Sequence, residues 1–184
     1  MKRLQKASIL ADLAERMRDH GSWCGETHIQ KAVYFLQELL KVPLGYRYML
    51  YKHGPFSFDL RDEITELRVY ELFRLETRPV PYGPSLRPTK NAEELKSRFP
   101  KTLNNYEGHL DFVAKELDGK GVADLERLAT ALYVSLESKN GGEESRAKQI
   151  HALKPHVSLD SALNAVKEVA AMRQKAEKLV GENS

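Results

Sequence analysis

The chain has 184 residues, of which 41% are hydrophobic and 30% charged, so it can form a globular domain with its own core. Its formal net charge of +3 is too small to demand a nucleic-acid partner. The single cysteine excludes an internal disulfide, and the longest nearly apolar run, residues 128–136, is too short to cross a bilayer. We therefore expect a cytoplasmic protein with one domain over residues 1–184, no signal peptide and no membrane segment.

Two amphipathic helices are expected first. Residues 4–19 place apolar side chains at helical spacing, and Gly21 ends this helix. A second helix begins at Thr27, because Thr27 and Gln30 match the T-x-x-Q capping box, in which hydroxyl and amide satisfy free N–H groups of the first turn. A wide apolar stripe follows, and Pro43 ends the helix.

The segment YKHGPFSFDLRDEI is predicted to be a corner between a strand and a third helix. Aromatic residues over 46–51 favour a short strand. Gly54 and Pro55 then turn the chain, and we expect a positive φ at Gly54. Ser57 is placed to cap a helix that runs to residue 68.

Residues 72–89 contain four prolines and one glycine, which favours an irregular hairpin or wing over a central strand. The rest of the chain shows helical periodicity. Helices are expected at 103–117, 125–136, up to about 154, and from 158 onward with fraying after 179. The predicted fold class is therefore mainly α with a small β-sheet. It consists of a winged-helix-like N-terminal part (residues 1–90) and an appended helical bundle (residues 91–184).

One pattern is reminiscent of a metal site, because His20, Cys24 and His28 are spaced four apart. Gly21 and Gly25 lie between them, where one helix must stop and the next begin. We therefore predict three unrelated loop and cap residues, no metal site and no cofactor.

His53 and Ser57 lie four residues apart across the turn, which allows a Ser–His catalytic pair as one interpretation. In the other, Ser57 caps the helix and His53 donates to a turn carbonyl. Helix capping needs no special chemistry, so the second interpretation is favoured. Nucleotide-binding and zinc motifs are absent from the sequence, and we expect a protein that is not an enzyme and has no catalytic residues.

The predicted third helix is unsuited to DNA, because residues 57–68 hold four carboxylates against two arginines. Residues 74–101 hold seven bases against three acids, a net charge of +4. The alternative function is accordingly a winged-helix nucleic-acid-binding regulator that uses this basic segment. Its contacts would be Arg74, Arg78, Arg87 and Lys90.

Protein recognition suits the third helix better, because protein interfaces favour aromatic and arginine anchors. Charged and polar side chains on this helix adjoin aromatic residues from the preceding corner. The predicted partner-binding residues are Tyr51, His53, Phe58, Arg61, Asp62, Thr65 and Arg68.

The segments THIQKAVYFLQ (27–37) and YKHGPFSFDLRDEITEL (51–67) resemble the uncharacterised YwgA-like proteins of bacteria and archaea. More distantly they resemble the Panacea domain of SocA-type antitoxins. The resemblance extends through LERLATALYV and ALKPHVSLDSAL and covers roughly residues 5–170. Positions that match are Gln30, Lys31, Tyr34, Gly54, Pro55 and Ser57, whereas Ile29 replaces a leucine and His53 occupies a variable position.

The resemblance implies a mostly helical fold with a small sheet and no catalytic residue to carry over. In antitoxin members it implies neutralisation of a toxin by direct contact, or delivery of that toxin to a protease. The expected function is thus a non-enzymatic, antitoxin-like module of a prokaryotic cell that binds another protein. The residue pattern leaves its oligomeric state open.

Overall fold

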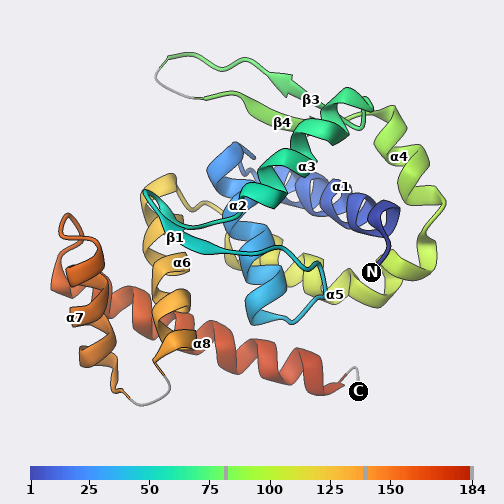
Figure 1. Ribbon diagram of the computed structural model, residues 1–184. Coiled ribbons are helices and arrows are strands. Elements are labelled where there is room, and N and C mark those ends of the chain that lie inside the picture. The colour runs from blue at the N-terminus through green and yellow to red at the C-terminus, as the bar shows by residue number, and fades with distance from the viewer. Residues whose placement is uncertain (81–82, 139–140, 183–184) are drawn as a thin grey trace.

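The structure, a computed structural model, describes residues 1–80, 83–138 and 141–182. It is mainly helical with two small antiparallel hairpins (Figure 1), which confirms the predicted fold class of mainly α with a small β content. The helical elements are α1 (Arg3–Asp19), α2 (Glu26–Tyr34), the π-helical turn η1 (Phe35–Leu39), α3 (Phe58–Val69), α4 (Lys90–Ser97), α5 (Pro100–Glu116), α6 (Val122–Glu137), α7 (Glu143–Leu153) and α8 (Leu159–Glu182). The strands are β1 (Met49–Tyr51), β2 (Gly54–Phe56), β3 (Phe73–Glu76) and β4 (Ser85–Pro88).

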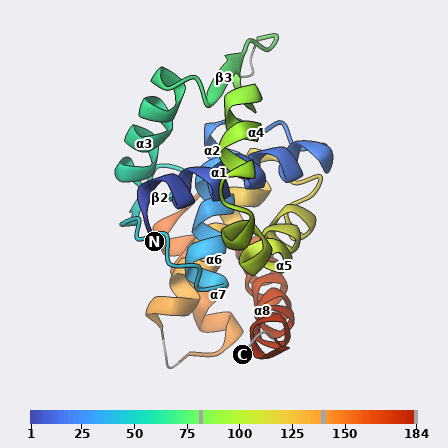
Figure 2. The same ribbon diagram turned by 90° about the vertical axis from the view of Figure 1, so that its right-hand side faces the viewer.

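Helices from both halves of the chain build one core. α1 packs against α4 and α5, while α2 packs against α6, which in turn contacts α7 and α8. The fully buried side chains include Ile9 and Leu13 of α1, Leu36 of η1 and Leu125 of α6. In Figures 1 and 2 the β3–β4 hairpin lies at one end of the molecule and α7 and α8 lie at the other. Among the described residues, no helix is both long and apolar enough to cross a bilayer.

The start of α3 follows the prediction, whereas the start of α2 does not. The Ser57 hydroxyl accepts a hydrogen bond from the Leu60 N–H at 3.2 Å, so Ser57 is the N-cap of α3. The N-cap of α2 is Gly25 and no side chain caps that helix, so the predicted Thr27–Gln30 capping box is wrong. The buried Gln30 amide instead donates to the Ser57 carbonyl at 2.9 Å and accepts from the Ser57 N–H at 3.0 Å.

The corner is a hairpin rather than a single strand and a turn. The strand predicted over 46–51 is shorter in the structure, where β1 covers only Met49–Tyr51. Gly54 and Pro55 belong to β2 instead of the turn. Gly54 has a φ of +78°, which confirms the predicted positive φ. A Cβ at Gly54 would lie 2.9 Å from the Thr130 Oγ1 of α6, so only glycine lets the hairpin approach α6 this closely.

The segment after α3 forms the predicted hairpin, β3–β4, although residues 81 and 82 lie outside the described part of the chain. The far edge of β4 is covered, because Gly25 bridges to Ser85 and the Leu86 N–H donates to the Cys24 carbonyl at 2.8 Å.

Helix α4 and the C-terminal end of α8 also differ from the sequence prediction. The helix α4, which is capped by the Thr89 hydroxyl, was not predicted. The last helix, predicted to fray after Leu179, continues to Glu182.

Candidate partner-binding surface

One side of α3 is exposed and carries five of the seven predicted partner-binding residues. Leu60 and Leu67 are buried on the opposite side, which fixes the rotation of the helix. Side chains three or four positions apart on a helix are neighbours, so the exposed residues form a continuous row. This row, the α3 stripe, consists of the half-buried Phe58 and the exposed Arg61, Asp62, Thr65 and Arg68.

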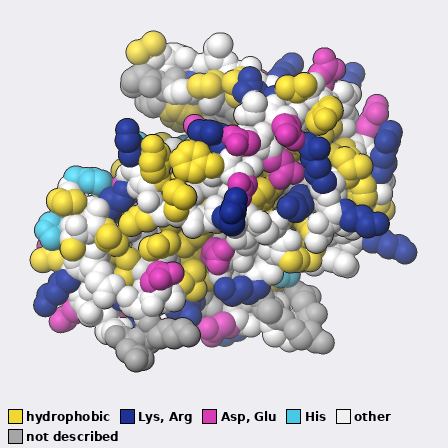
Figure 3. All heavy atoms as spheres, in the orientation of Figure 1, with side chains coloured by type: hydrophobic (Ala, Val, Ile, Leu, Met, Phe, Trp, Pro, Cys, Tyr) yellow, Lys and Arg dark blue, Asp and Glu magenta, His cyan; other side chains and the backbone are white. Residues whose placement is uncertain are grey.

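An aromatic cluster adjoins the start of the α3 stripe. The ring centroids of Tyr51 and Phe58 are 5.6 Å apart, and Phe56 lies 5.9 Å from Tyr51 and 5.1 Å from Phe58. The Arg61 guanidinium carbon lies 4.9 Å from the Phe58 centroid, within cation–π range. Tyr51 keeps 46% of its surface exposed. Figure 3 shows hydrophobic side chains gathered on this face, over the β1–β2 hairpin and the start of α3.

His53, the remaining predicted partner-binding residue, lies beside α6 and away from the stripe. Its Nδ1 is 3.3 Å from the Glu126 Oε2, so the prediction that His53 bonds a turn carbonyl is wrong. Glu126 is only 6% exposed, and the His156 Nε2 lies 3.4 Å from its Oε1. Burial raises the pKa of Glu126, but Lys154 and His53 outweigh that effect and hold the pKa below its ordinary value.

Two buried lysines hold the β1–β2 hairpin against the helices. The Lys154 Nζ donates to the Tyr51 carbonyl at 2.9 Å and lies 3.2 Å from the Glu126 Oε1. The Lys31 Nζ donates to the Pro55 carbonyl at 2.8 Å, and burial lowers the pKa of Lys31 to about 8. Because buried ammonium groups are satisfied by hairpin carbonyls, the aromatic cluster is carried on a fixed backbone.

The Ser–His pair is not assembled. Ser57 is fully buried and its hydroxyl caps α3, while the His53 ring contacts Glu126. The cap interpretation of Ser57 is therefore confirmed.

The three residues with metal-like spacing contact different partners. Cys24 is buried, His28 stacks on Trp23 with ring centroids 6.1 Å apart, and the His20 Nδ1 lies 4.0 Å from an Asp118 carboxylate oxygen. Within the described ranges, no three His, Cys, Asp or Glu side chains are arranged to hold a metal ion.

The four basic residues predicted for the alternative function line two hollows that adjoin at Arg74 and Leu75. Arg74, Arg87 and Lys90 line a cavity beside β3, and Arg78 lines the adjoining hollow together with Arg74 and Arg18. Other bases of the 74–101 segment lie elsewhere. Lys96 is ion-paired with Asp12 and Glu15 on α1, and Arg98 lines a different hollow beside Tyr70.

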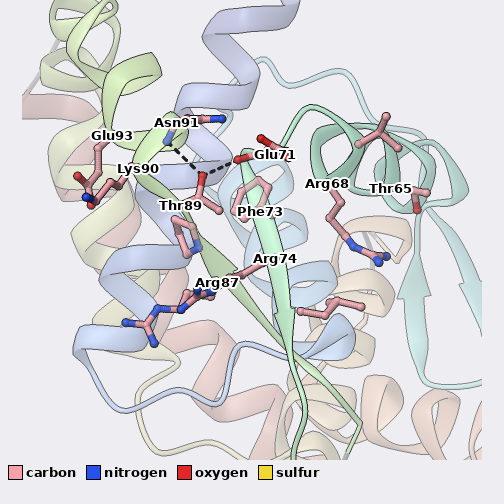
Figure 4. A pocket seen from close by; sticks show the side chains of 13 residues that line it. Thr65, Arg68, Glu71, Phe73, Arg74, Arg87, Thr89, Lys90, Asn91 and Glu93 are labelled. Carbon is pink, nitrogen blue, oxygen red and sulfur yellow. Dashed lines mark hydrogen bonds between the residues drawn. The ribbon is translucent and has the colours of Figure 1, made fainter.

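The cavity beside β3 continues the α3 stripe at its C-terminal end. Its volume is about 930 Å³, and we call it the hairpin groove. In Figure 4, β3 runs between Arg74 and Arg87 on one side and Thr65 and Arg68 of α3 on the other. A second hollow of about 480 Å³ shares Thr65, Arg68 and Leu75 with it, so the two cavities adjoin.

Several residues of this surface were not predicted from the sequence. Phe56 completes the aromatic cluster, and Glu126, Lys154 and His156 stabilise the hairpin that carries it. One sequence signal was available, because Glu126 is a carboxylate close to an apolar helical run. Its partners lie about thirty to seventy residues away in the chain, and nothing in local sequence patterns indicates them.

No protein family model matches this chain, and no curated protein shows significant sequence similarity to it. A function must therefore be inferred from the surface itself.

Proposed function

We propose that the protein is a non-enzymatic protein-binding module, of the antitoxin-like or adaptor type, that binds its partner through the aromatic cluster and the α3 stripe. The observation that carries this proposal is the contact of Tyr51, Phe58 and Arg61 on an exposed face, where the two rings meet edge to face and the guanidinium lies over Phe58. Aromatic and arginine side chains dominate binding energy at protein interfaces.

Preorganisation supports the same conclusion. Lys154 and Lys31 bind carbonyl groups of the β1–β2 hairpin, and Gly54 packs it against α6. A partner that binds Tyr51 and Phe58 would therefore order little additional backbone, which lowers the entropic cost of association.

A nucleic-acid partner fits this face less well. α3 carries Asp59, Asp62, Glu63 and Glu66, which repel phosphate groups. The resemblance to YwgA-like proteins and the Panacea domain supports a protein partner, a toxin or a protease.

The test is quantitative affinity purification from the native host with a charge-reversed surface. The double variant Arg61→Glu with Arg68→Glu removes both cations of the α3 stripe, whose side chains are exposed, so the melting temperature should stay nearly unchanged. We expect proteins enriched by the wild type to lose at least about tenfold in capture, the consequence of losing one or two anchors.

The matched control is Arg98→Glu with Lys101→Glu, which makes the same charge change outside the α3 stripe. Retained capture by this control, together with loss by the stripe variant, supports the proposal. Equal capture by wild type and stripe variant would rule it out.

A further inference from the structure

The outer edge of β3 is open. β3 pairs with β4 on one side, and no described residue makes a backbone hydrogen bond to its other side. β4, in contrast, has its second edge covered by residues 24 and 25. An open strand edge presents unpaired N–H and C=O groups and is a template for another strand.

The register shows which backbone groups point outward. The Leu86 N–H is used by the Cys24 carbonyl on the far side of β4, so the pair Leu75↔Leu86 is a non-hydrogen-bonded pair of the hairpin. By alternation, the N–H and C=O of Phe73 and Leu75 point away from β4. Pro88 lies opposite Phe73 and agrees with this assignment, because its missing N–H would also point out of the hairpin.

The hairpin groove leaves space along this edge. It is lined by β3 itself, by Arg68 and Val69 of α3 and by the start of α4, and its volume is about 930 Å³. Two apolar side chains beside the edge remain exposed, Leu75 at 41% and Val69 at 77%. An added strand would cover both.

The two faces of the hairpin differ in chemistry. Side chains alternate along a strand, so Leu75 and Leu86 share one face while Arg74 and Arg87 share the other. The apolar face borders the adjoining 480 Å³ hollow, which is also lined by Trp23 and Ile64. A strand added to β3 would therefore place alternate side chains in an apolar hollow and next to arginines.

Charge selects the kind of strand. The groove and the polar face of the hairpin carry five basic side chains and three carboxylates. The carboxylates therefore neutralise only part of the positive charge. Glu76 already binds Arg18 at 2.9 Å and Arg87 at 2.6 Å. The cations are Arg18, Arg68, Arg74, Arg87 and Lys90, and the carboxylates are Glu71, Glu76 and Glu93.

We propose that an extended, acidic segment of the partner protein pairs with β3 as a third strand, with apolar and acidic residues in alternation. This inference rests on the proposed function and adds its mode of recognition. Main-chain hydrogen bonds to Phe73 and Leu75 provide affinity, and the two faces provide specificity.

The experiment selects randomised peptides of about eight residues, a length that spans one strand, against the immobilised full chain. We expect enriched peptides to alternate Asp or Glu with Val, Ile or aromatic residues. A synthetic enriched peptide should perturb the amide NMR signals of Phe73 and Leu75 and slow their hydrogen exchange. Enrichment without acidic residues, no enrichment, or signal changes confined to other surfaces would overturn the proposal.

Variants of Leu75 distinguish binding through main-chain hydrogen bonds to β3 from binding through side-chain contacts alone. Leu75→Pro removes an outward N–H and leaves the β3–β4 hydrogen bonds intact, so affinity for the peptide should fall about tenfold or more. Leu75→Val retains the N–H and should bind nearly as the wild type. Arg74→Glu should also weaken binding, whereas Arg98→Glu, outside the groove, should not.

A peptide series keeps the proposal testable even if Leu75→Pro does not fold. N-methylation at alternate peptide positions should abolish binding where the N–H faces β3 and be tolerated at the intervening positions. Uniform tolerance of N-methylation would exclude strand pairing. Stronger competition by an oligonucleotide than by any acidic peptide would assign the groove to nucleic acid instead.

The outcomes distinguish this inference from the proposed function. Loss of partner capture by the α3-stripe variant with full capture by Leu75→Pro would leave the binding module in place and remove the strand mechanism. Full capture by both variants would remove both proposals.

Discussion

Gly54 meets two constraints that no residue with a side chain can meet together. Its φ of +78° disfavours other residues, and its Cα faces Thr130 and the Glu126 carbonyl of α6 at close range. The first constraint could be expected from a glycine before a proline in a predicted turn. The second depends on a helix more than seventy residues away in the chain and could not.

We expect Gly54→Ala to lower the free energy of unfolding by about 3 kcal/mol or more, because backbone strain and a steric clash act together. The control is Gly45→Ala, since Gly45 has a similar φ of +77° but a Cβ there would meet no atom within 4 Å. That variant should lose about 1 kcal/mol from strain alone. Urea denaturation measures both, and equal losses would show that the contact with α6 does not matter.

Lys31 is a buried lysine whose environment favours the neutral form of its amino group. Burial, which outweighs the favourable effect of Glu126, lowers the pKa of Lys31 from 10.5 to about 8. Between these two values the unfolded chain binds more protons than the folded chain, so the free energy of unfolding rises with pH. Below pH 8 both states carry the charge and the folded state bears the full cost of burying it.

The free energy of unfolding of the wild type, taken relative to that of Lys31→Met at the same pH, should therefore rise between pH 8 and pH 9.5, by at most about 1.4 kcal/mol per pH unit. Lys101→Met, at an exposed position, should show the same rise relative to Lys31→Met. Urea denaturation measures each value, and the difference between the two proteins cancels the opposing effect of Cys24 and the buried tyrosines, whose raised pKa values keep protons on the folded chain that the unfolded chain loses. Parallel curves for wild type and Lys31→Met would contradict the assignment.

Single residues also mark the limit of the sequence prediction. Ser57 was predicted correctly because a helix cap depends on residues three positions away. Gln30 and His53 were singled out but given the wrong partners, since each bonds to a group far along the chain, Ser57 and Glu126 respectively. Residue type indicates the capacity for a hydrogen bond, and only the fold selects which group accepts it.

At the scale of elements, side chains of α2 and η1 fix the position of the segment that leads into α3. Gln30 pairs with both backbone groups of Ser57, and Gln37 does the same with Tyr46, at 2.8 Å for each bond of Gln37. The two glutamines are seven residues apart, which is about two helical turns, so they lie on the same side of the helix. Together they position both ends of the segment that contains the β1–β2 hairpin.

Gln30→Ala should lower the free energy of unfolding by about 2–3 kcal/mol, because it leaves the buried Ser57 N–H without a partner and removes one of the two hydrogen bonds to the Ser57 carbonyl, which the Arg61 N–H still donates to. Gln37→Ala removes an equivalent pair of bonds at a half-buried site, where water can replace the amide, and should cost about 1 kcal/mol. Urea denaturation of the two variants checks the order, and a larger loss for Gln37→Ala would contradict this assignment of the two costs.

The long amphipathic helices and the proline-rich hairpin were predictable, because helical periodicity and proline placement are local signals. α4 was missed, since Lys90–Ser97 is short and strongly polar. The π-helical turn at Phe35–Leu39 was also missed, and no composition signal distinguishes it from the α-helix that it extends.

At the scale of the whole molecule, stability is unevenly distributed. α1, α2 and α6 lie in the shared core, whereas the β3–β4 hairpin is a two-strand ribbon with one open edge. Isolated two-strand ribbons are only marginally stable, so this hairpin depends on the contacts of β4 with residues 24 and 25.

Native-state hydrogen exchange should therefore be slowest in α1, α2 and α6 and faster in the β3–β4 hairpin, with the outward amides of Phe73 and Leu75 unprotected. Mass spectrometry of peptic peptides gives the order of the elements, and NMR resolves the two amides. Hairpin protection equal to that of α6 in the free protein would contradict an open edge.

The lone thiol makes this part of the molecule measurable by simple chemistry. Cys24 is fully buried next to β4, its carbonyl accepts the Leu86 N–H, and burial raises the pKa of its thiol to about 12. A thiol reagent can then react only when the chain around Cys24 opens, and no other cysteine contributes to the signal. The labelling rate would report how often the hairpin detaches from the core, and a ligand that bridges β3 to α3 should slow it.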